Sequence, residues 1–329
     1  MLKYIFLPLF ILFAQITFCQ VFEWKAGFTG IADNREYFNT VTVPQTIFGS
    51  RVTLECGLNV DKFHQFRVGF NYLYEYGSTI TSRQPDPVIY YKGYKEPLTL
   101  FIGAFPRKNL LLYPLVLLTD TLNYFRPNIE GMLLMVNGKW GYQNLWIDWT
   151  SRQTDTERET FLFGLSGRIN KGILFFTHHL LMYHFAGSKI PIPDDSIRDN
   201  GGGVFRFGMD LSGATRLDSL IFSAGSIISF DRIRKTGEWQ TPSGILSEIN
   251  ATYKGFGIRT LYYRGEGHQL LYGDGFYKAD SYGRTDFYFT PINSTHVKGR
   301  FTYSLHFIEG KTDNSQSFIL SIDINGSKQ

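Results

Sequence analysis

Residues 297–307 read Val-Lys-Gly-Arg-Phe-Thr-Tyr-Ser-Leu-His-Phe. Every second position, from Val297 to Phe307, is apolar or glycine, and every position between them is polar. A repeat of two places alternate side chains on opposite faces of an extended chain. The stretch therefore predicts a long β-strand with one apolar face and one polar face.

The same alternation recurs along the chain, for example from Val52, Phe66, Phe205 and Phe318. It predicts sixteen strands, near 21–30, 47–60, 64–77, 87–94, 97–107, 128–137, 139–151, 158–169, 172–186, 203–213, 217–230, 244–254, 256–265, 284–291, 296–308 and 315–325. The segments 87–94 and 128–137 carry the weakest pattern, so fourteen strands is the alternative count. Strands of ten or more residues exceed the five or six that are usual in soluble sheets and match a tilted membrane strand.

The composition excludes several classes of protein. Aromatic residues make up 17% of the 329 residues and charged residues 19%, which excludes intrinsic disorder. The 33 basic residues face 29 acidic ones, and the resulting net charge of +4 comes without a basic cluster, so a nucleic-acid partner is not expected.

The N-terminal segment, residues 1–19, is typical of a signal peptide, because Lys3 precedes a short apolar stretch. Cleavage would leave Gln20 first; the alternative is a lipoprotein acylated at Cys19. After removal of this segment Cys56 is the only cysteine, so neither an internal disulfide nor a cysteine-based zinc site is expected.

Residues 20–329 as a whole resemble an outer-membrane β-barrel of the porin type. The resemblance is carried by long alternating strands, a nearly uncharged apolar face and the export signal, and a soluble sandwich would not explain all three. It implies a single domain, a closed antiparallel barrel in the outer membrane of a Gram-negative-type envelope. It also implies contact with membrane lipid, passage of small polar solutes and a possible homo-oligomer.

Four long connections are expected on one side of such a barrel, at 107–127, 187–202, 231–243 and 266–283. Residues 107–127 are unusually rich in leucine for a loop. Three interpretations are open: the segment folds into the barrel as a plug or constriction, it lies on the membrane surface, or it forms another strand.

The polar residues that alternate with the apolar ones along each strand are predicted to line the lumen, and they include seven basic and seven acidic residues. The candidates for pore-lining residues are Arg67, Glu75, Arg107, Arg168, Arg206, Asp210, Glu248, Arg259, Asp286, Lys298, Arg300 and His306, and the inventory also includes Glu55, Asp148 and Asp323. Because the two signs balance, strong ion selectivity is not expected. An outer-membrane channel for passive or facilitated diffusion of small polar solutes is the leading hypothesis.

The alternatives are a non-conducting structural or secretion-associated barrel and an outer-membrane hydrolase. The motifs G-x-S-x-G and H-E-x-x-H and the phosphate-binding loop are absent, and no catalytic residue is assigned. A hydrolase would have to use a pair such as Ser304 and His306, which share one face. His178 and His184 share a face that His179 does not, so no metal site is expected there. The spacing of Asp194, Asp195, Asp199 and Asn200 does not match a calcium loop, and no cofactor is expected.

Overall fold

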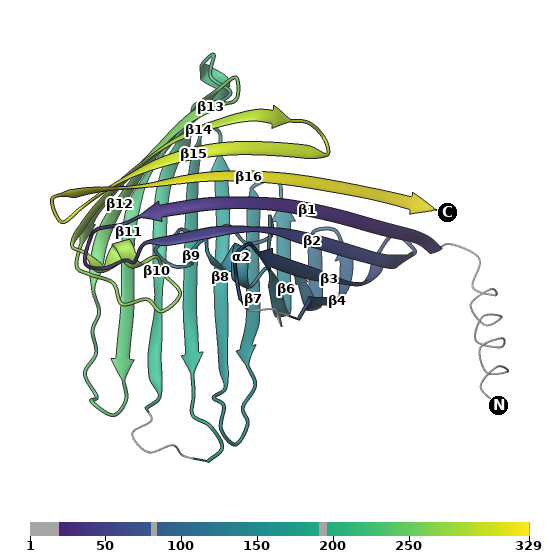
Figure 1. Ribbon diagram of the computed structural model, residues 1–329, viewed down its shortest axis with the longest axis horizontal. Coiled ribbons are helices and arrows are strands. Elements are labelled where there is room, and N and C mark those ends of the chain that lie inside the picture. The colour runs from purple at the N-terminus through teal and green to yellow at the C-terminus, as the bar shows by residue number, and fades with distance from the viewer. Residues whose placement is uncertain (1–19, 80–83, 191–195, 329) are drawn as a thin grey trace.

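The computed structural model describes residues 20–79, 84–190 and 196–328, which form one closed sheet of sixteen strands (Figure 1). The expected signal peptide, Cys19, Asp194 and Asp195 lie outside these residues. The strands are β1 (Gln20–Glu36), β2 (Gln45–Val60), β3 (His64–Glu75), β4 (Asp86–Lys95), β5 (Leu98–Pro106), β6 (Asn128–Gly138), β7 (Gly141–Ser151), β8 (Thr160–Lys171), β9 (Leu174–Phe185), β10 (Arg198–Asp210), β11 (Ser219–Ile233), β12 (Ser243–Tyr253), β13 (Phe256–Gly265), β14 (Ser281–Asn293), β15 (Val297–Ile308) and β16 (Lys311–Lys328). Three short helices interrupt the connections: α2 (Leu122–Phe125), η2 (Ser212–Ala214) and η3 (Gly275–Lys278).

Each strand pairs antiparallel with its neighbours in the sequence, and β1 closes the barrel by pairing with β16. The seam runs from Phe22, opposite Lys328, to Glu36, opposite Asn314. Closure leaves no strand edge unpaired, which a sheet surrounded by hydrocarbon requires. The count of sixteen is confirmed, and both weakly patterned segments are strands, β4 and β6.

The first and last strands are longer than the sequence pattern predicts. Strand β1 continues to Glu36 instead of ending near residue 30, and β16 starts at Lys311 instead of residue 315. Polar residues occupy both faces in these extensions, so the alternation of apolar and polar residues stops before the backbone pairing does. Here the hydrogen-bonded partner strand, and not the apolar pattern, maintains the extended conformation.

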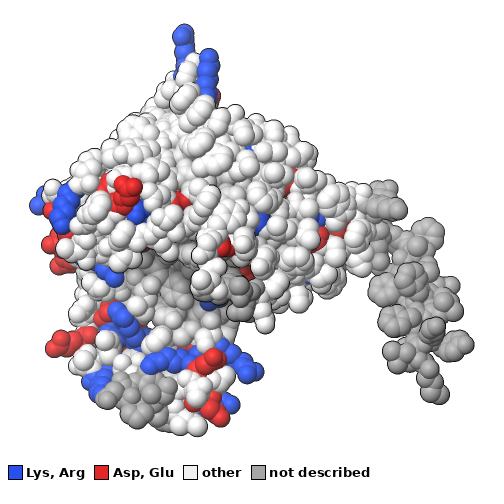
Figure 2. All heavy atoms as spheres, in the orientation of Figure 1, with Lys and Arg blue, Asp and Glu red and all other residues white. Residues whose placement is uncertain are grey.

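The two faces of the sheet differ as the alternation predicts. Large apolar side chains such as Phe207, Phe256 and Phe301 remain more than half exposed on the outer face. Figure 2 shows charged side chains mainly near the loops and edges, with much of the surface between them uncharged. An exposed apolar area of this extent is suited to membrane hydrocarbon and not to water.

The long connections leave one end of the barrel, here called the long-loop end. Consecutive strands are antiparallel, so the connections that follow odd-numbered strands share this end, and they include 107–127 and 266–280. The other end, called the short-turn end, carries brief turns such as Lys254–Gly255, with the 211–218 connection as its longest. The expectation of long loops on one side is confirmed.

No helix among the described residues is long and apolar enough to cross a membrane.

Candidate functional site

The lumen is occupied by the leucine-rich connection 107–127, here called the infolded loop. Val116, Leu117 and Leu118 of this loop are buried in the main apolar cluster of the molecule. The Tyr113 hydroxyl donates a hydrogen bond to the Leu180 carbonyl oxygen (3.1 Å) and accepts one from Trp146 Nε1 (2.9 Å). Of the three interpretations of this segment, the plug is therefore the one that the structure supports.

Both ends of the infolded loop are fixed to the same carboxylate on β7. Arg107 Nη2 lies 2.5 Å from Asp148 Oδ2, and Arg126 Nη2 lies 3.6 Å from Asp148 Oδ1. On the opposite wall, Arg51 of β2 donates to the carbonyl oxygens of Asn123 (2.7 Å) and Tyr124. Charge-assisted hydrogen bonds thus hold the loop across the lumen.

A second connection, residues 266–280, also turns into the lumen and packs on the infolded loop. Thr119 N donates to the Tyr272 carbonyl oxygen (2.7 Å), and Asp274 N donates to the Leu115 carbonyl oxygen (2.8 Å). Burial raises the pKa of the Asp274 carboxyl to about 6, and the charge of Asp120 adds to this effect. Phe276 and Tyr277 of this connection are almost fully buried in the main apolar cluster, so its aromatic side chains fill space in the lumen.

The cavities between these two connections and the barrel wall include three that are lined in part by β1. The short-turn cavity, of about 520 Å³, lies at the start of β1 and includes Glu23, Lys25 and Arg67. The middle cavity, of about 600 Å³, separates the infolded loop from β1, β2 and β16. The arginine cavity, of about 240 Å³, lies against β13–β16 and β1 and extends to Tyr37. Successive cavities share lining residues: Lys25 and Glu55 join the first two, and Asp120 and Tyr124 join the last two.

The charged side chains on the inner face of the barrel are largely paired with each other. Arg206 Nη1 and Arg259 Nε lie 3.1 and 2.9 Å from the two carboxylate oxygens of Glu248. Arg284 lies 2.6 Å from Asp286 on its own strand. Such pairs cancel much of the field that a run of one sign would create, as the balanced inventory predicts.

The structure groups some of the predicted pore-lining residues and separates others. Arg259, Asp286 and Arg300 line the arginine cavity, whereas Arg67 lines the short-turn cavity. Those away from the cavities are Glu75 at the end of β3, Arg168 against the Phe175 ring, Asp210 bonded to Ser212, and Lys298, exposed near the short-turn end. Arg107 lines the middle cavity, but its guanidinium is buried against Asp148.

Several inward charged residues were missed: Glu23, Lys25, Asp33, Arg35, Arg51 and Arg284. For β1 only part of the signal was present, because the polar positions Glu23, Lys25, Asp33 and Arg35 share one phase of two but Ile31 interrupts it. Ending this strand near residue 30 removed Asp33 and Arg35 from the inventory. Both now line the arginine cavity, where Arg35 Nη2 lies 2.7 Å from Asp33 and 3.1 Å from Asp120.

His306 points inward, as predicted, but it is sealed from the three cavities described here. Its ring stacks on Phe276 at a centroid distance of 4.5 Å, and Nδ1 lies 2.8 Å from the Tyr282 hydroxyl. Its serine neighbour is Ser315, whose Oγ lies 3.3 Å from Nε2, and not Ser304, which accepts from Arg284. The register between β15 and β16 decides this neighbour, and the sequence alone does not supply it.

The histidines of β9 divide between the two faces as predicted. His179 is buried inside against the Tyr113 ring, while His178 and His184 lie in the outward phase with Met182. Among the described residues, no three histidine, cysteine, aspartate or glutamate side chains are placed to share a metal ion. Asp199, considered above for a calcium loop, instead pairs with Arg232 and Arg234.

A family model described as lipid A 3′-O-deacylase-type matches residues 26–327, which is nearly the whole barrel. The chain belongs to this family. No curated protein matches the chain. The family's description names an enzyme type. The absence of the common catalytic motifs therefore does not exclude the hydrolase alternative.

Solved structures similar to this member of the lipid A 3′-O-deacylase-type family are outer-membrane barrels. An anion-selective porin from Comamonas acidovorans aligns over 92% of this chain and 99% of its own, with a TM-score of 0.57 and 8% identity. A loop-deletion mutant of OmpT, an outer membrane protein of Vibrio cholerae, aligns over 93% of this chain and 100% of its own, with a TM-score of 0.55 and 8% identity. OmpF of Salmonella typhi, in complex with daunomycin, aligns over 92% of this chain and 97% of its own, with a TM-score of 0.52 and 10% identity. At these identities the likeness establishes the fold, a porin-like outer-membrane β-barrel.

Proposed function

We propose that the protein is an outer-membrane channel in which small polar solutes pass beside the infolded loop. One observation carries this proposal: three cavities with shared lining residues, each lined in part by charged side chains, follow the wall at β1 and β16 past the loop. The infolded loop would act as the constriction that sets the size limit. Membrane lipid would surround the barrel, as its apolar outer face requires.

The contacts between loop and wall differ in strength along this path. Lys108 Nζ lies 3.9 Å from Asp323 Oδ2 on β16, and both side chains are more than half exposed. Exposed pairs of this kind contribute little to stability. The loop is therefore held firmly by Asp148 of β7 and by Arg51 of β2 but only weakly by β16, and solute passage is proposed along the β16 side.

Conductance in planar bilayers tests this proposal. Purified protein, shown to be folded by a heat-dependent shift on gel electrophoresis, should give stepwise currents. Replacing residues 110–118 by a short Gly-Ser linker should enlarge each step, because the constriction is removed. A matched control shortens the exposed connection 234–242 at the same end and should leave the step size unchanged. Folded protein that gives no steps with or without the linker would refute the channel and favour a structural barrel.

A lipid hydrolase is the second candidate, favoured by the family description and by the contact of His306 with Ser315. In such a reaction the Ser315 hydroxyl would attack an ester carbonyl while His306 Nε2 accepts its proton, and the sugar hydroxyl would leave with that proton as the ester C–O bond breaks. Water would then hydrolyse the acyl-Ser315 ester, which releases the fatty acid and restores the hydroxyl. The stack of Phe276 on His306 would have to open first.

The hydrolase is tested with lipid A that carries a 3′-O-linked acyl chain, by mass spectrometry of released fatty acid. Release by the wild type and its loss in Ser315→Ala would support this candidate, with the gel shift as the folding control. Folded wild type that releases no fatty acid would remove it.

A further inference from the structure

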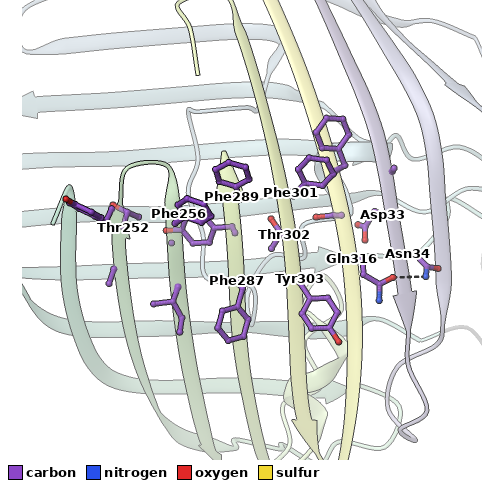
Figure 3. Close-up of a pocket in the computed structure, with 18 of the residues that line it drawn as sticks. Asp33, Asn34, Thr252, Phe256, Phe287, Phe289, Phe301, Thr302, Tyr303 and Gln316 are labelled. Atoms are coloured by element: carbon purple, nitrogen blue, oxygen red, sulfur yellow. Dashed lines mark hydrogen bonds between the residues drawn. The ribbon is translucent and has the colours of Figure 1, made fainter. Parts of the chain in front are cut away.

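The outer wall carries a groove of about 880 Å³ that spans β12–β16, β1 and β2 (Figure 3). Its volume falls in the range of small-molecule sites, whereas a barrel wall is ordinarily an even apolar band. Asp33 is the only ionisable acid or base among its lining residues, and its carboxylate pairs with Arg35 in the arginine cavity. The groove is therefore an uncharged surface, separated from the lumen by the sheet.

Two rows of outward side chains form the sides of the groove. Directly paired residues on seven strands make the first row: Phe48, Ala32, Phe318, Phe301, Phe289, Phe256 and Tyr253. Its rings stack in pairs, with centroids 4.3 Å apart for Phe301–Phe318 and for Phe256–Phe289. Six strand spacings of about 4.8 Å give a row of roughly 29 Å, enough for one extended acyl chain.

The second row lies two residues nearer the long-loop end on β1, β15 and β16. It comprises Thr46, Asn34, Gln316, Tyr303, Phe287, Ile258 and Ala251. It changes from apolar to polar along its length, and the labelled side chains in Figure 3 follow this change from Phe287 to Gln316 and Asn34. Thr46 Oγ1 donates to Asn34 Oδ1 (2.9 Å), and Asn34 Nδ2 donates to Gln316 Oε1 (3.1 Å).

The two ends of the groove lie near opposite ends of the barrel. Asn34 is two residues from the end of β1 at the long-loop end, whereas Tyr253 and Phe256 flank the Lys254–Gly255 turn at the short-turn end. Because strands in barrels are tilted, a row of paired residues descends across the membrane. The polar cluster thus lies toward the outer membrane surface, the rings of Phe318, Phe301 and Phe289 lie at hydrocarbon depth, and Phe256 and Tyr253 lie near the short-turn end.

From this arrangement we propose that the groove binds one acyl chain of an outer-leaflet lipid. The chain lies along the rings from Phe318 toward Phe256, and the polar part of the lipid hydrogen-bonds the cluster of Asn34, Thr46 and Gln316. Amide and hydroxyl groups suit the ester and hydroxyl oxygens of a lipid, and hydrocarbon is the medium that already surrounds this face. This site does not depend on whether the lumen conducts.

Photolabelling tests the site with phosphatidylethanolamine that carries a diazirine on its acyl chain, in phosphatidylcholine vesicles. Peptides from β13–β16 should be labelled in excess over peptides from β6 and β7, whose outer residues Met132, Leu134 and Leu145 are similarly exposed. Ala32→Trp should abolish this excess, because the indole fills the small position in the first row. The control Ala224→Trp places the same ring on the exposed outer face of β11, outside the groove, and should keep the excess.

Three results would overturn the proposal. The first is even labelling around the barrel, which indicates only bulk hydrocarbon. The second is an excess that survives Ala32→Trp in protein that shows the gel shift. The third is an unlabelled groove whose peptides cross-link to another copy of the chain, which would make this face a subunit interface.

Discussion

Asp274 is a carboxylate held between the two infolded loops. Its pKa, raised by burial to about 6, lies above the ordinary value of 3.8. The folded protein therefore bears a cost for ionising Asp274 at neutral pH, and this cost shrinks as the pH falls below about 6 and vanishes only below the ordinary value of 3.8. Arg284 of β14 and Arg35 of β1 reduce the shift, and Asp120 of the infolded loop increases it.

We expect Asp274→Asn to raise the melting temperature at about pH 7.5, because the amide carries no charge and can still accept the hydrogen bond from Phe276 N. At about pH 5 the folded carboxyl is mostly protonated and part of the cost is gone, so the difference between the two melting temperatures should be smaller than at pH 7.5. Thermal unfolding in detergent at both pH values measures this effect. An equal difference at the two pH values would contradict it.

Asp148 provides a second prediction for a single residue, because its carboxylate is fully buried and forms ion pairs with both Arg107 and Arg126. Removing one partner of a buried ion pair costs about 3–5 kcal/mol, because the remaining charge has no compensation. We expect Asp148→Asn to release the infolded loop to limited proteolysis. The control is Lys108→Ala, which removes an exposed pair worth about 1 kcal/mol or less and should leave the loop protected.

At the level of elements, the strands were predictable and the position of the infolded loop was not. The period of two is a local property, so it located all sixteen strands, although glycine and polar residues on both faces hid the end of β1. The leucines of 107–127 showed only that the segment needs an apolar environment. Which wall they meet depends on barrel closure, which brings Tyr113 beside Trp146 and Leu180.

The contact of Trp146 with the infolded loop gives the prediction for this element. Its ring meets the Tyr113 ring edge-on at 5.6 Å and is 1% exposed. Trp146→Ala removes this packing, worth about 3–5 kcal/mol, and should give larger and noisier current steps. Trp149→Ala is the control, because this indole is on the same strand but 40% exposed on the outer face. Similar currents for both variants would show that Trp146 does not position the loop.

Over the whole molecule, the sequence predicted the balance of charge better than its arrangement. Equal numbers of basic and acidic residues were expected inside, yet their pairing across strands depends on register, as for Arg206 with Glu248. Residue counts cannot tell a charge that faces a cavity from one covered by a loop. Arg259 faces the arginine cavity, whereas the guanidinium of Arg107, at the start of the infolded loop, is buried against Asp148.

Ion selectivity follows from this paired arrangement. With most lumen charges compensated, the wild-type channel should show a reversal potential near zero in a potassium chloride gradient. Glu248→Gln leaves Arg206 and Arg259 without their shared carboxylate, so the reversal potential should move toward anion preference. Asp286→Asn should shift it in the same direction by freeing Arg284, whereas the exposed Glu238→Gln in the 234–242 connection should not. A strong ion preference in the wild type would contradict the compensation of the lumen charges. No shift in either lumen variant would mean that ions do not pass these residues.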